Sequence, residues 1–374
     1  MPSIPVAKQR EIARLHKGGL SYRAIAKRVG VHFTVVGDYV RGDARPAAPL
    51  TPEQLEESIR AALRRGHAGE KDLAKDLGIT LTRLRGAVRT MQERGVMIVG
   101  RPGGILDMAP VTALEPGRHE IKGTAGEWTH HFGVTSDNHL CNRHSRLDVL
   151  KAAYDHFERV GIKDVFNCGN WIDGEAPFNK TELIVAPGME SQLDYLVDNW
   201  PARKGITTHF IAGDDHEGWY TRREGVEIGK RLEQSAREQG RHDLHYLGYA
   251  ECDIALVFGR GAAVMRVVHP GGGSAYAISY TDQKRTESYQ GGEKPHIELV
   301  GHYHKFNQGY PREVHTVQCG CTCDQTLFMR KKRLQAHVGF VEVKIKQDNQ
   351  GAIERFAVEW FPFFDRGYYE RRFR

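Results

Sequence analysis

The sequence has few cysteines and no long apolar run. Six cysteines among 374 residues are too few for a disulfide-stabilised secreted scaffold, which favours a reducing compartment. No window reaches the roughly 18 consecutive apolar residues that a membrane helix needs, and the opening MPSIPVAKQR lacks the apolar stretch of a signal peptide. We therefore expect a cytoplasmic protein with no membrane partner.

A surplus of positive charge is also missing from most of the chain. The net charge is +6, but residues 1–110 contain 19 Lys and Arg against 11 Asp and Glu, whereas the rest contains 34 against 36. The whole surplus lies in the first third, which predicts an N-terminal region that faces nucleic acid, attached to a nearly neutral body. A solvated basic surface without a partner is the alternative.

The first 43 residues have the pattern of a helix-turn-helix. Short helices are expected over 9–17, from the N-cap Ser21 to about 29, and over 33–40, with a Gly-containing turn at 30–32. The stretch GLSYRAIAKRVGVHFTVVGDYV resembles the DNA-binding domains of resolvases and transposases. This resemblance implies DNA contacts by Arg23, His32 and Thr34, and an ordinary three-helix bundle is the alternative.

A second small module is expected over residues 51–108, after a Pro-containing linker at 44–50. Its predicted elements are helices at 51–65, 70–77 and 80–94 and two short strands at 96–99 and 105–108. This arrangement resembles a winged helix. The third helix carries Arg83, Arg85 and Arg89, which suit phosphates and base edges. Winged helices also dock proteins, and that role is the alternative.

From residue 129 to 374 short apolar runs alternate with helical stretches, which predicts an α/β domain after a connector around 109–128. Strands are expected at 131–136, 165–168, 208–212, 264–268, 297–300 and 314–318, helices at 146–160 and 189–200, and a final hairpin at 338–346 and 352–361. The fold class is therefore multidomain, with two small helical modules followed by an α/β body.

Metal-ligand residue types follow five of these strands. The five segments read SDNH, GNWIDG, AGDDHE, VVHPGGG and GHYH. Sites in open α/β sheets form at the carboxyl ends of strands, so these loops can converge. A mixture of carboxylate, amide and imidazole suits Mn²⁺, Fe or Zn²⁺ rather than Ca²⁺ or a thiolate-bound structural zinc.

The order of the five segments resembles the calcineurin-like metallophosphoesterases, whose motifs read D-x-H, GD, GNH, a lone His and GHxH. The resemblance covers roughly residues 130–320 and is greatest to phosphoesterases of phages and mobile elements, a branch near the DNA-repair exonucleases. It implies a four-layer α/β sandwich with two divalent metal ions. We expect Mn²⁺, with Fe or Zn²⁺ as alternatives, and in-line attack on phosphorus by a metal-activated water.

The resemblance also implies roles for single residues. It places one metal on Asp137, His139 and His304, the other on Asp215, His269 and His302, and Asn170 between the two. His216 matches the family's catalytic histidine, which steadies the scissile phosphate or protonates the leaving oxygen. Asp137 belongs to the catalytic set as a metal ligand.

Two departures from the family pattern affect the bridge between the metals. Asn170 stands where the family has an Asp, and Asp215 where it has a metal-binding Asn, with Asp214 as an extra acid. A neutral amide is a poor bridge between cations, so we expect Asp215 or Asp214 to supply it. A one-metal site and an inactive site are the alternatives. Asp173 is expected to orient a histidine rather than bind metal directly.

Together these patterns predict a metal-dependent phosphodiesterase acting on DNA, a nuclease delivered by its N-terminal modules. One alternative is a phosphomonoesterase, or an esterase for a nucleotide or phosphoprotein, since the same metal chemistry serves all these substrates. Another is a non-catalytic DNA-binding regulator with a degenerate phosphoesterase body, as the amide of Asn170 suggests. Helix-turn-helix proteins often pair on symmetric sites, so a homo-oligomer is an open expectation.

Overall fold

The computed structural model describes residues 6–40, 50–109, 117–273 and 275–363. The chain forms two compact units, Met1–Ala109 and Pro110–Arg374, and each is described by itself. Most of the expected linker at 44–50, the start of the connector at 109–128 and the chain after residue 363 lie outside the described residues.

The first helices have almost the expected bounds: α1 is Val6–Lys17, α2 Tyr22–Val29 and α3 Phe33–Val40. The Ser21 side chain accepts a hydrogen bond from the backbone N–H of Ala24 and caps α2, which satisfies a donor that the helix itself leaves unpaired. Gly30 ends α2 with a φ of 68°, a conformation that favours glycine. The three helices enclose a small core around Ile12, Ile25 and Val36.

The second group of elements follows the expected order with one addition. The elements are α4 Pro52–Arg64, β1 Ala68–Gly69, α5 Glu70–Asp76, α6 Leu81–Glu93, β2 Ile98–Arg101 and β3 Ile105–Met108. The two-residue strand β1 was not expected, and it completes a three-stranded sheet in the order β1-β3-β2. Thr51 and Gln54 form a capping box that fixes the start of α4.

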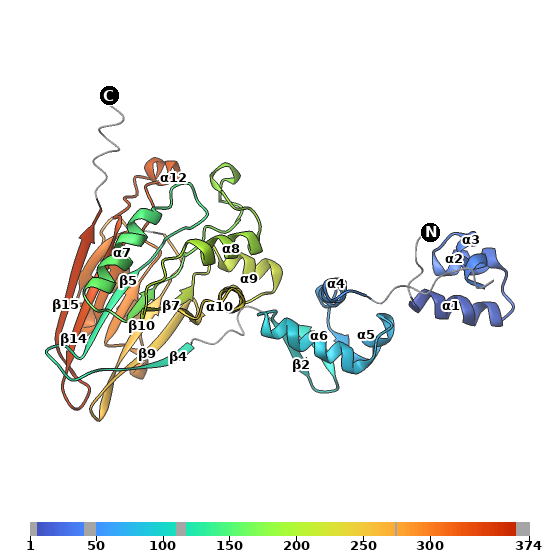
Figure 1. Cartoon of the computed structure of the whole chain (residues 1–374), viewed down its shortest axis with the longest axis horizontal. Helices are drawn as coiled ribbons and strands as arrows, with labels where there is room; N and C mark the ends of the chain where they lie inside the picture. Colours follow the sequence, from blue (N-terminus) through green and yellow to red (C-terminus); the bar gives the residue numbers. More distant parts are fainter. Residues whose placement is uncertain (1–5, 41–49, 110–116, 274, 364–374) are drawn as a thin grey trace. The chain divides into compact units, whose positions relative to one another are not determined.

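The second unit is built on two six-stranded mixed sheets (Figure 1). One has the order β12-β13-β11-β10-β9-β4, with β4 Gly117–Lys122, β9 Glu251–Phe258, β10 Gly261–Val268, β11 Ile297–Val300, β12 Phe306–Gly309 and β13 His315–Cys319. The other has the order β15-β14-β5-β6-β7-β8, with β5 His130–Thr135, β6 Asp164–Asn167, β7 Thr207–Ala212, β8 Leu244–Tyr249, β14 Gly339–Gln347 and β15 Ile353–Pro362.

Helices cover the outer face of the sheet that contains β5. Helices α7 Leu147–Arg159, α8 Met189–Asn199 and α10 Ile228–Glu238 share a core with the sheet that contains β5. A second core, which includes Phe166, Ile211 and Leu299, fills the space between the sheets. On the other sheet Gln318 of β13 donates to Asp282 in α11, Tyr280–Ser288. The α/β sandwich expected for the body is therefore present.

Strand β4 lies where the sequence predicts a connector. It pairs in parallel with β9 at the edge of its sheet. Its sequence GRHEIK has only one aliphatic residue, because an edge strand faces solvent and needs no apolar run. Strands β8, β9 and β12 were not expected either. β8 and β12 are also edge strands, whereas β9 lies between β10 and β4 and alternates buried with half-buried residues.

One buried ion cluster joins β14 to the neighbouring elements. The Glu342 carboxylate accepts hydrogen bonds from His131 at 2.9 Å and His156 at 2.6 Å, and it pairs with Lys344 at 2.6 Å. Burial alone would raise the pKa of Glu342, but these three partners outweigh burial and lower the pKa to about 2.

Candidate metal centre

The five loops that carry metal-ligand residue types begin where strands end, as expected. β5, β6 and β7 are parallel neighbours, and β10 and β11 are parallel neighbours in the other sheet. The carboxyl ends of parallel strands meet at one edge of a sheet. Asp137 and His139 follow β5, and His302 and His304 follow β11, so the sandwich brings together residues that are far apart in the sequence.

The backbone of these loops is unusual at the candidate ligands. Asp137, His139, Asn170, His302 and His304 all have positive φ, between 46° and 78°. Left-handed φ at residues other than glycine costs about 1–3 kcal/mol each and persists only where the surroundings hold it. Such outliers cluster at functional sites, and here five of them fall on the candidate ligands.

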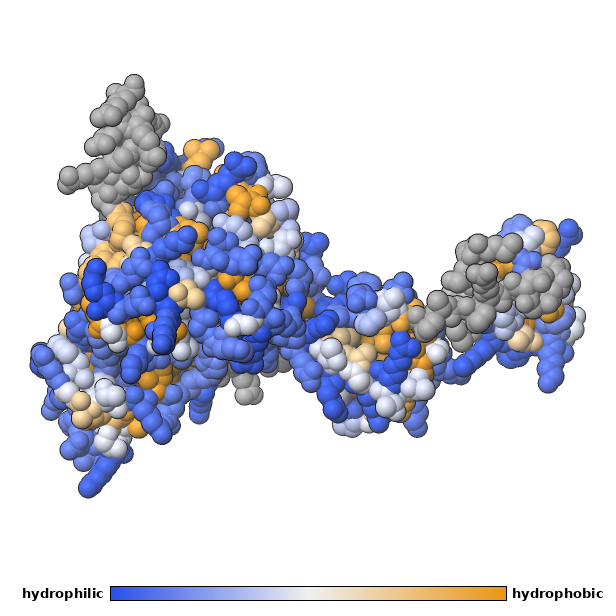
Figure 2. Space-filling model, in the orientation of Figure 1, coloured by the Kyte–Doolittle hydropathy of each residue, from blue (hydrophilic) through white to orange (hydrophobic). Residues whose placement is uncertain are grey.

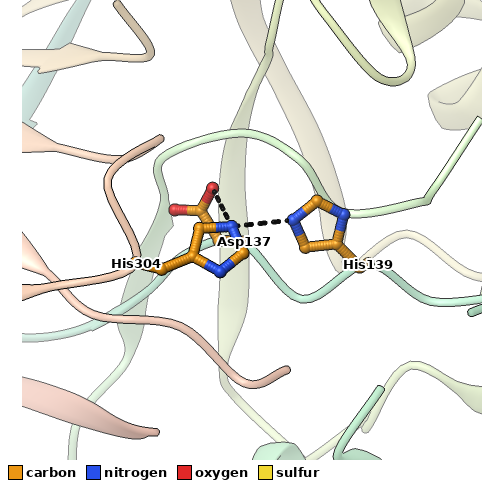
Figure 3. A group of neighbouring side chains, drawn as sticks. All are labelled: Asp137, His139 and His304. Carbon is orange, nitrogen blue, oxygen red and sulfur yellow. Dashed lines mark hydrogen bonds and ion pairs between the residues drawn. The ribbon is translucent and has the colours of Figure 1, made fainter. Parts of the chain in front are cut away.

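Asp137, His139 and His304 form the first group of converging ligand atoms. The Nε2 atoms of His139 and His304 lie 3.1 Å apart, and His304 Nε2 lies 3.4 Å from Asp137 Oδ1. Figure 3 shows both rings pointing these nitrogens toward the same space. The expected first set of ligands is therefore brought together.

Neighbouring groups fix the orientation of this first set. The second oxygen of Asp137 accepts hydrogen bonds from the Ser136 hydroxyl at 2.6 Å and from the His302 backbone N–H at 2.9 Å. Asp173 Oδ1 lies 3.2 Å from His139 Nδ1, on the side of the ring away from His304. A carboxylate in that place orients a ligating histidine, which is the role expected for Asp173.

Asp215, His269 and His302 form a second group. Asp215 Oδ1 lies 3.4 Å from His269 Nε2, and Oδ2 lies 3.2 Å from His302 Nδ1. The other nitrogens of the two rings donate to backbone carbonyls: His269 Nδ1 to Cys168 O and His302 Nε2 to Gly272 O, both at 2.6 Å. These bonds set the tautomers so that the remaining nitrogens face Asp215.

The distances in both groups fit divalent metal binding. With bonds of 2.0–2.2 Å, two ligands of one metal lie about 3.0 Å apart at 90° and about 3.4 Å apart at a tetrahedral angle. The four separations, 3.1 to 3.4 Å, lie within that interval. His269 Nε2 is also buried without a hydrogen-bond partner, which a metal bond would satisfy.

The charges of the two groups support the same interpretation. Burial alone would raise the pKa of Asp137, but the rings of His304, His269 and His139 hold it well below its usual range. Burial would lower the pKa of His269, but Asp215 outweighs burial and raises the pKa to about 9. Each carboxylate is thus stabilised by positive charge, which the two cations would supply in place of protons on the histidines.

Asn170 lies between the two groups. Its Nδ2 is 3.4 Å from Asp137 Oδ1. A Cβ atom on Gly213 would lie 2.5 Å from Asn170 Oδ1 and 2.9 Å from His269 Cδ2, so both side chains pack against that glycine. Asn170 Oδ1 is buried and has no hydrogen-bond partner. Asn170 therefore occupies the position expected for the bridging residue. Its side chain has one acceptor atom, the amide oxygen, and that oxygen has no hydrogen-bond partner.

The structure separates the two adjacent acids of the GDDHE segment. Asp215 faces His269 and His302, whereas Asp214 forms an ion pair with Arg222 and accepts a hydrogen bond from Tyr249 at 2.6 Å. The Asp214 side chain is 55% exposed and belongs to neither ligand group. The structure therefore does not bring Asp214, expected as a possible ligand or bridge, to either group, because its surface partners hold it away from the centre.

His216 lies beside the first group. Its Nδ1–H donates to the backbone carbonyl of Asp173 at 2.7 Å, and its ring centroid is 4.4 Å from that of His139. Burial and the nearby His139 ring lower the pKa of His216 to about 4. The imidazole is therefore neutral at pH 7, with Nε2 as the nitrogen left for a substrate contact. The exposed ring of Phe178 packs against it at 5.2 Å.

Glu217 is a residue of the site that the sequence analysis missed. Its side chain is fully buried, and its Oε1 accepts from the backbone N–H groups of Asn170 at 2.9 Å and Gly213 at 2.7 Å. Burial raises the pKa of Glu217 to about 8. Glu217 ties the loop after β6 to the loop after β7 and so positions Asn170 and Asp215. The only sequence signal was its place directly after His216.

The residues expected to contact DNA lie at exposed positions of the first unit. Arg23 packs over the Phe33 ring, with its guanidinium carbon 5.6 Å from the ring centre, and His32 Nδ1 is 2.9 Å from the Thr34 hydroxyl. On α6, Arg83, Arg85 and Arg89 are all exposed. Arg83 donates to Leu50 O at 2.6 Å, and Arg85 pairs with Glu70 at 2.7 Å. Arg85 would have to leave this pair to reach a phosphate.

No helix in the described part of the chain is both long and apolar enough to cross a bilayer. No protein-family model and no curated protein matches the chain. Similar solved structures include an archaeal phosphodiesterase (10% identity over 62% of this chain and 100% of that one, TM-score 0.35) and a dimetal phosphatase from Danio rerio (9% over 63% and 97%, TM-score 0.34). Another is a zinc complex of Vps29 from Entamoeba histolytica (12% over 62% and 99%, TM-score 0.29). All three TM-scores lie below 0.5.

Proposed function

We propose that the protein is a metal-dependent phosphodiesterase that acts on DNA. The observation that carries this proposal is the pair of ligand groups, Asp137–His139–His304 and Asp215–His269–His302, each of which combines residues that follow strands of both sheets. Two divalent cations held there would lower the pKa of a water molecule and stabilise the charge that develops on both sides of a phosphorus centre. The motif order of the calcineurin-like metallophosphoesterases agrees with this assignment.

The chain's own residues would position the substrate and hold protons in defined places. Asp173 directs His139 Nε2 toward the first group through its contact with Nδ1. The same residue's carbonyl accepts the Nδ1–H of His216, so Asp173 aligns two rings at once. A neutral His216 offers Nε2 as an acceptor for a hydrogen bond from the substrate, and it becomes a donor only after it has taken up a proton.

The surroundings of His216 support a substrate that carries bases. Phe178 is 57% exposed, and its ring touches His216. An exposed aromatic ring beside the reacting group can stack on a nucleobase, whereas a small phosphomonoester has nothing to stack. The exposed arginines of α6 and the positive charge of residues 1–110 support delivery to DNA by the first unit.

The adjacent residues Asp214 and Asp215 allow a test of the proposed function in which one variant is the control for the other. Asp215→Ala removes a ligand side chain from the second group, whereas Asp214→Ala removes a carboxylate that pairs with Arg222 outside it. With Mn²⁺ and a small diester, bis(p-nitrophenyl) phosphate, we expect Asp215→Ala to lose at least about 100-fold in kcat/KM, and Asp214→Ala to stay near wild type.

A faster reaction of the wild type with p-nitrophenyl phosphate would instead favour the phosphomonoesterase. No turnover of either ester by protein shown to hold metal would favour the non-catalytic regulator suggested by Asn170.

A further inference from the structure

The chain between β13 and β14 forms an insert whose two ends are attached to metal-ligand loops. At one end the Thr322 N–H donates to Asp137 O at 3.3 Å, and its hydroxyl accepts from Asn138 at 2.9 Å. At the other end the His337 N–H donates to His304 O at 2.8 Å. Residues 324–336, which we call the α12 insert, therefore leave and rejoin the body beside the first ligand group.

The insert is held in one conformation by its own contacts. The Thr326 side chain caps α12, Leu327–Lys331, by accepting from the Met329 N–H at 3.2 Å. The Met329 side chain is buried, and Gln325 donates to Leu334 O at 2.6 Å across the insert. Asp324 pairs with Arg146 at 3.1 Å. The outward side chains of the insert therefore have a fixed place relative to the centre.

These outward side chains combine apolar and positive groups. Leu327 and Phe328 are 64% and 63% exposed, and four consecutive exposed basic residues, Arg330 to Arg333, follow within one turn. Residues 325–336 contain no Asp or Glu. In Figure 2, hydrophobic residues (orange) lie beside hydrophilic residues (blue) at the position that α12 has in Figure 1. An exposed aromatic next to clustered positive charge matches the chemistry of a single-stranded polynucleotide, which offers phosphates and base faces together.

We propose that the α12 insert is a binding site for a single-stranded nucleic acid, which it holds against the rim of the metal centre. Basic residues 331–333 contact backbone phosphates and Phe328 stacks on a base. This proposal rests on the proposed phosphodiesterase function and adds a contact that the first unit does not provide, since helix-turn-helix modules read duplex grooves. A strand bound here lies next to the loops of Asp137 and His304, where a phosphodiester would react.

The test uses the full chain, EDTA to prevent cleavage, and fluorescence anisotropy of a labelled oligo(dT) across a NaCl series. The variant is Lys331→Gln/Lys332→Gln/Arg333→Gln. Its control is Lys122→Gln/Lys204→Gln/Arg260→Gln. These exposed residues end β4, lie in the α8–β7 loop and lie in the β9–β10 turn, all away from the ligand loops, and the control removes the same charge. We expect the insert variant to bind more weakly and to lose about 2 from the slope of log affinity against log salt, because each phosphate contact on a single strand contributes about 0.7. The control should match wild type.

Phe328→Ala separates stacking from charge. We expect about 5-fold or greater loss of oligo(dT) affinity with an unchanged salt slope. Wild-type affinity and slope in both insert variants would overturn the proposal. So would a loss of binding to phosphatidylglycerol vesicles with oligo(dT) binding intact, which would assign the insert to a membrane surface.

Hydrolysis of bis(p-nitrophenyl) phosphate separates this proposal from the proposed function. The insert variants should hydrolyse it as wild type does, because none of the changed residues is a ligand. If wild type hydrolyses no ester but oligo(dT) binding still depends on the insert, the phosphodiesterase fails while the binding site stands.

Discussion

Replacing Asn170 by Asp should change stability in opposite directions without and with metal. The new carboxylate would sit about where Nδ2 now lies, 3.4 Å from Asp137 Oδ1, and both residues are buried. Two unit charges at that distance repel by about 5 kcal/mol at an effective dielectric constant of about 20. Protonating one carboxyl at pH 7 instead costs about 4 kcal/mol. The metal-free variant should therefore lose up to about 4 kcal/mol of unfolding free energy.

Metal should reverse this loss, because a carboxylate between the two ligand groups can bind both cations where an amide cannot. The assay is urea unfolding of wild type and Asn170→Asp in EDTA and in Mn²⁺, with metal content measured in parallel. Asn349→Asp, an exposed residue in the β14–β15 turn, adds the same charge elsewhere and should change little. If the metal-free variant is as stable as wild type, or if Mn²⁺ does not restore the loss, Asn170 does not lie between two cation sites.

The remaining predictions concern other groups. His216→Ala should keep its bound metal and lose about 100- to 10,000-fold in kcat on a diester, measured beside metal analysis; loss of metal would show that His216 is a ligand. Glu342 has a folded pKa of about 2, below its ordinary value of 4.5, so its stabilisation is present above about pH 4.5 and is lost as the pH falls toward 2. Thermal unfolding of Glu342→Gln should accordingly show about 1–3 kcal/mol less stability at pH 7 and a weaker decline on acidification; equal acid curves would refute this. Arg89→Gln should lower duplex DNA affinity and reduce the salt slope by about 0.9, and an unchanged slope would remove α6 from the DNA interface.

The sequence was sufficient for the elements with the clearest local signals. The strands before the ligand loops are buried on both faces and read as apolar runs, and N-caps such as Ser21 and Thr51 mark helix starts. The element bounds near the ligands were therefore close to those observed. β4 was missed because an edge strand of polar sequence has no such run. The edge strands β8 and β12 were missed too, and so was the interior strand β9, although its residues alternate between buried and half-buried positions.

The arrangement of the candidate site depended on information that the sequence does not contain. Asp214 and Asp215 are adjacent residues of the same type, so the sequence does not distinguish them. Asp214 turns outward because Arg222 and Tyr249 lie where they can bind its side chain. Glu217 could not be distinguished from a surface acid, because its role depends on two backbone N–H groups from different loops. Residue types and order predicted which candidate ligands meet, whereas the partners of each side chain required the fold.

The most direct test of the central claim is a cleavage assay on linear duplex, supercoiled and single-stranded DNA with Mn²⁺, beside an EDTA sample and Asp137→Ala. Asp137 Oδ1 faces His304 in the first ligand group, so its loss should remove metal as well as rate. The account predicts cleavage by wild type that stops both in EDTA and in the variant. Cleavage that persists in either, or its absence from wild-type protein shown to carry metal, would contradict a metal-dependent nuclease.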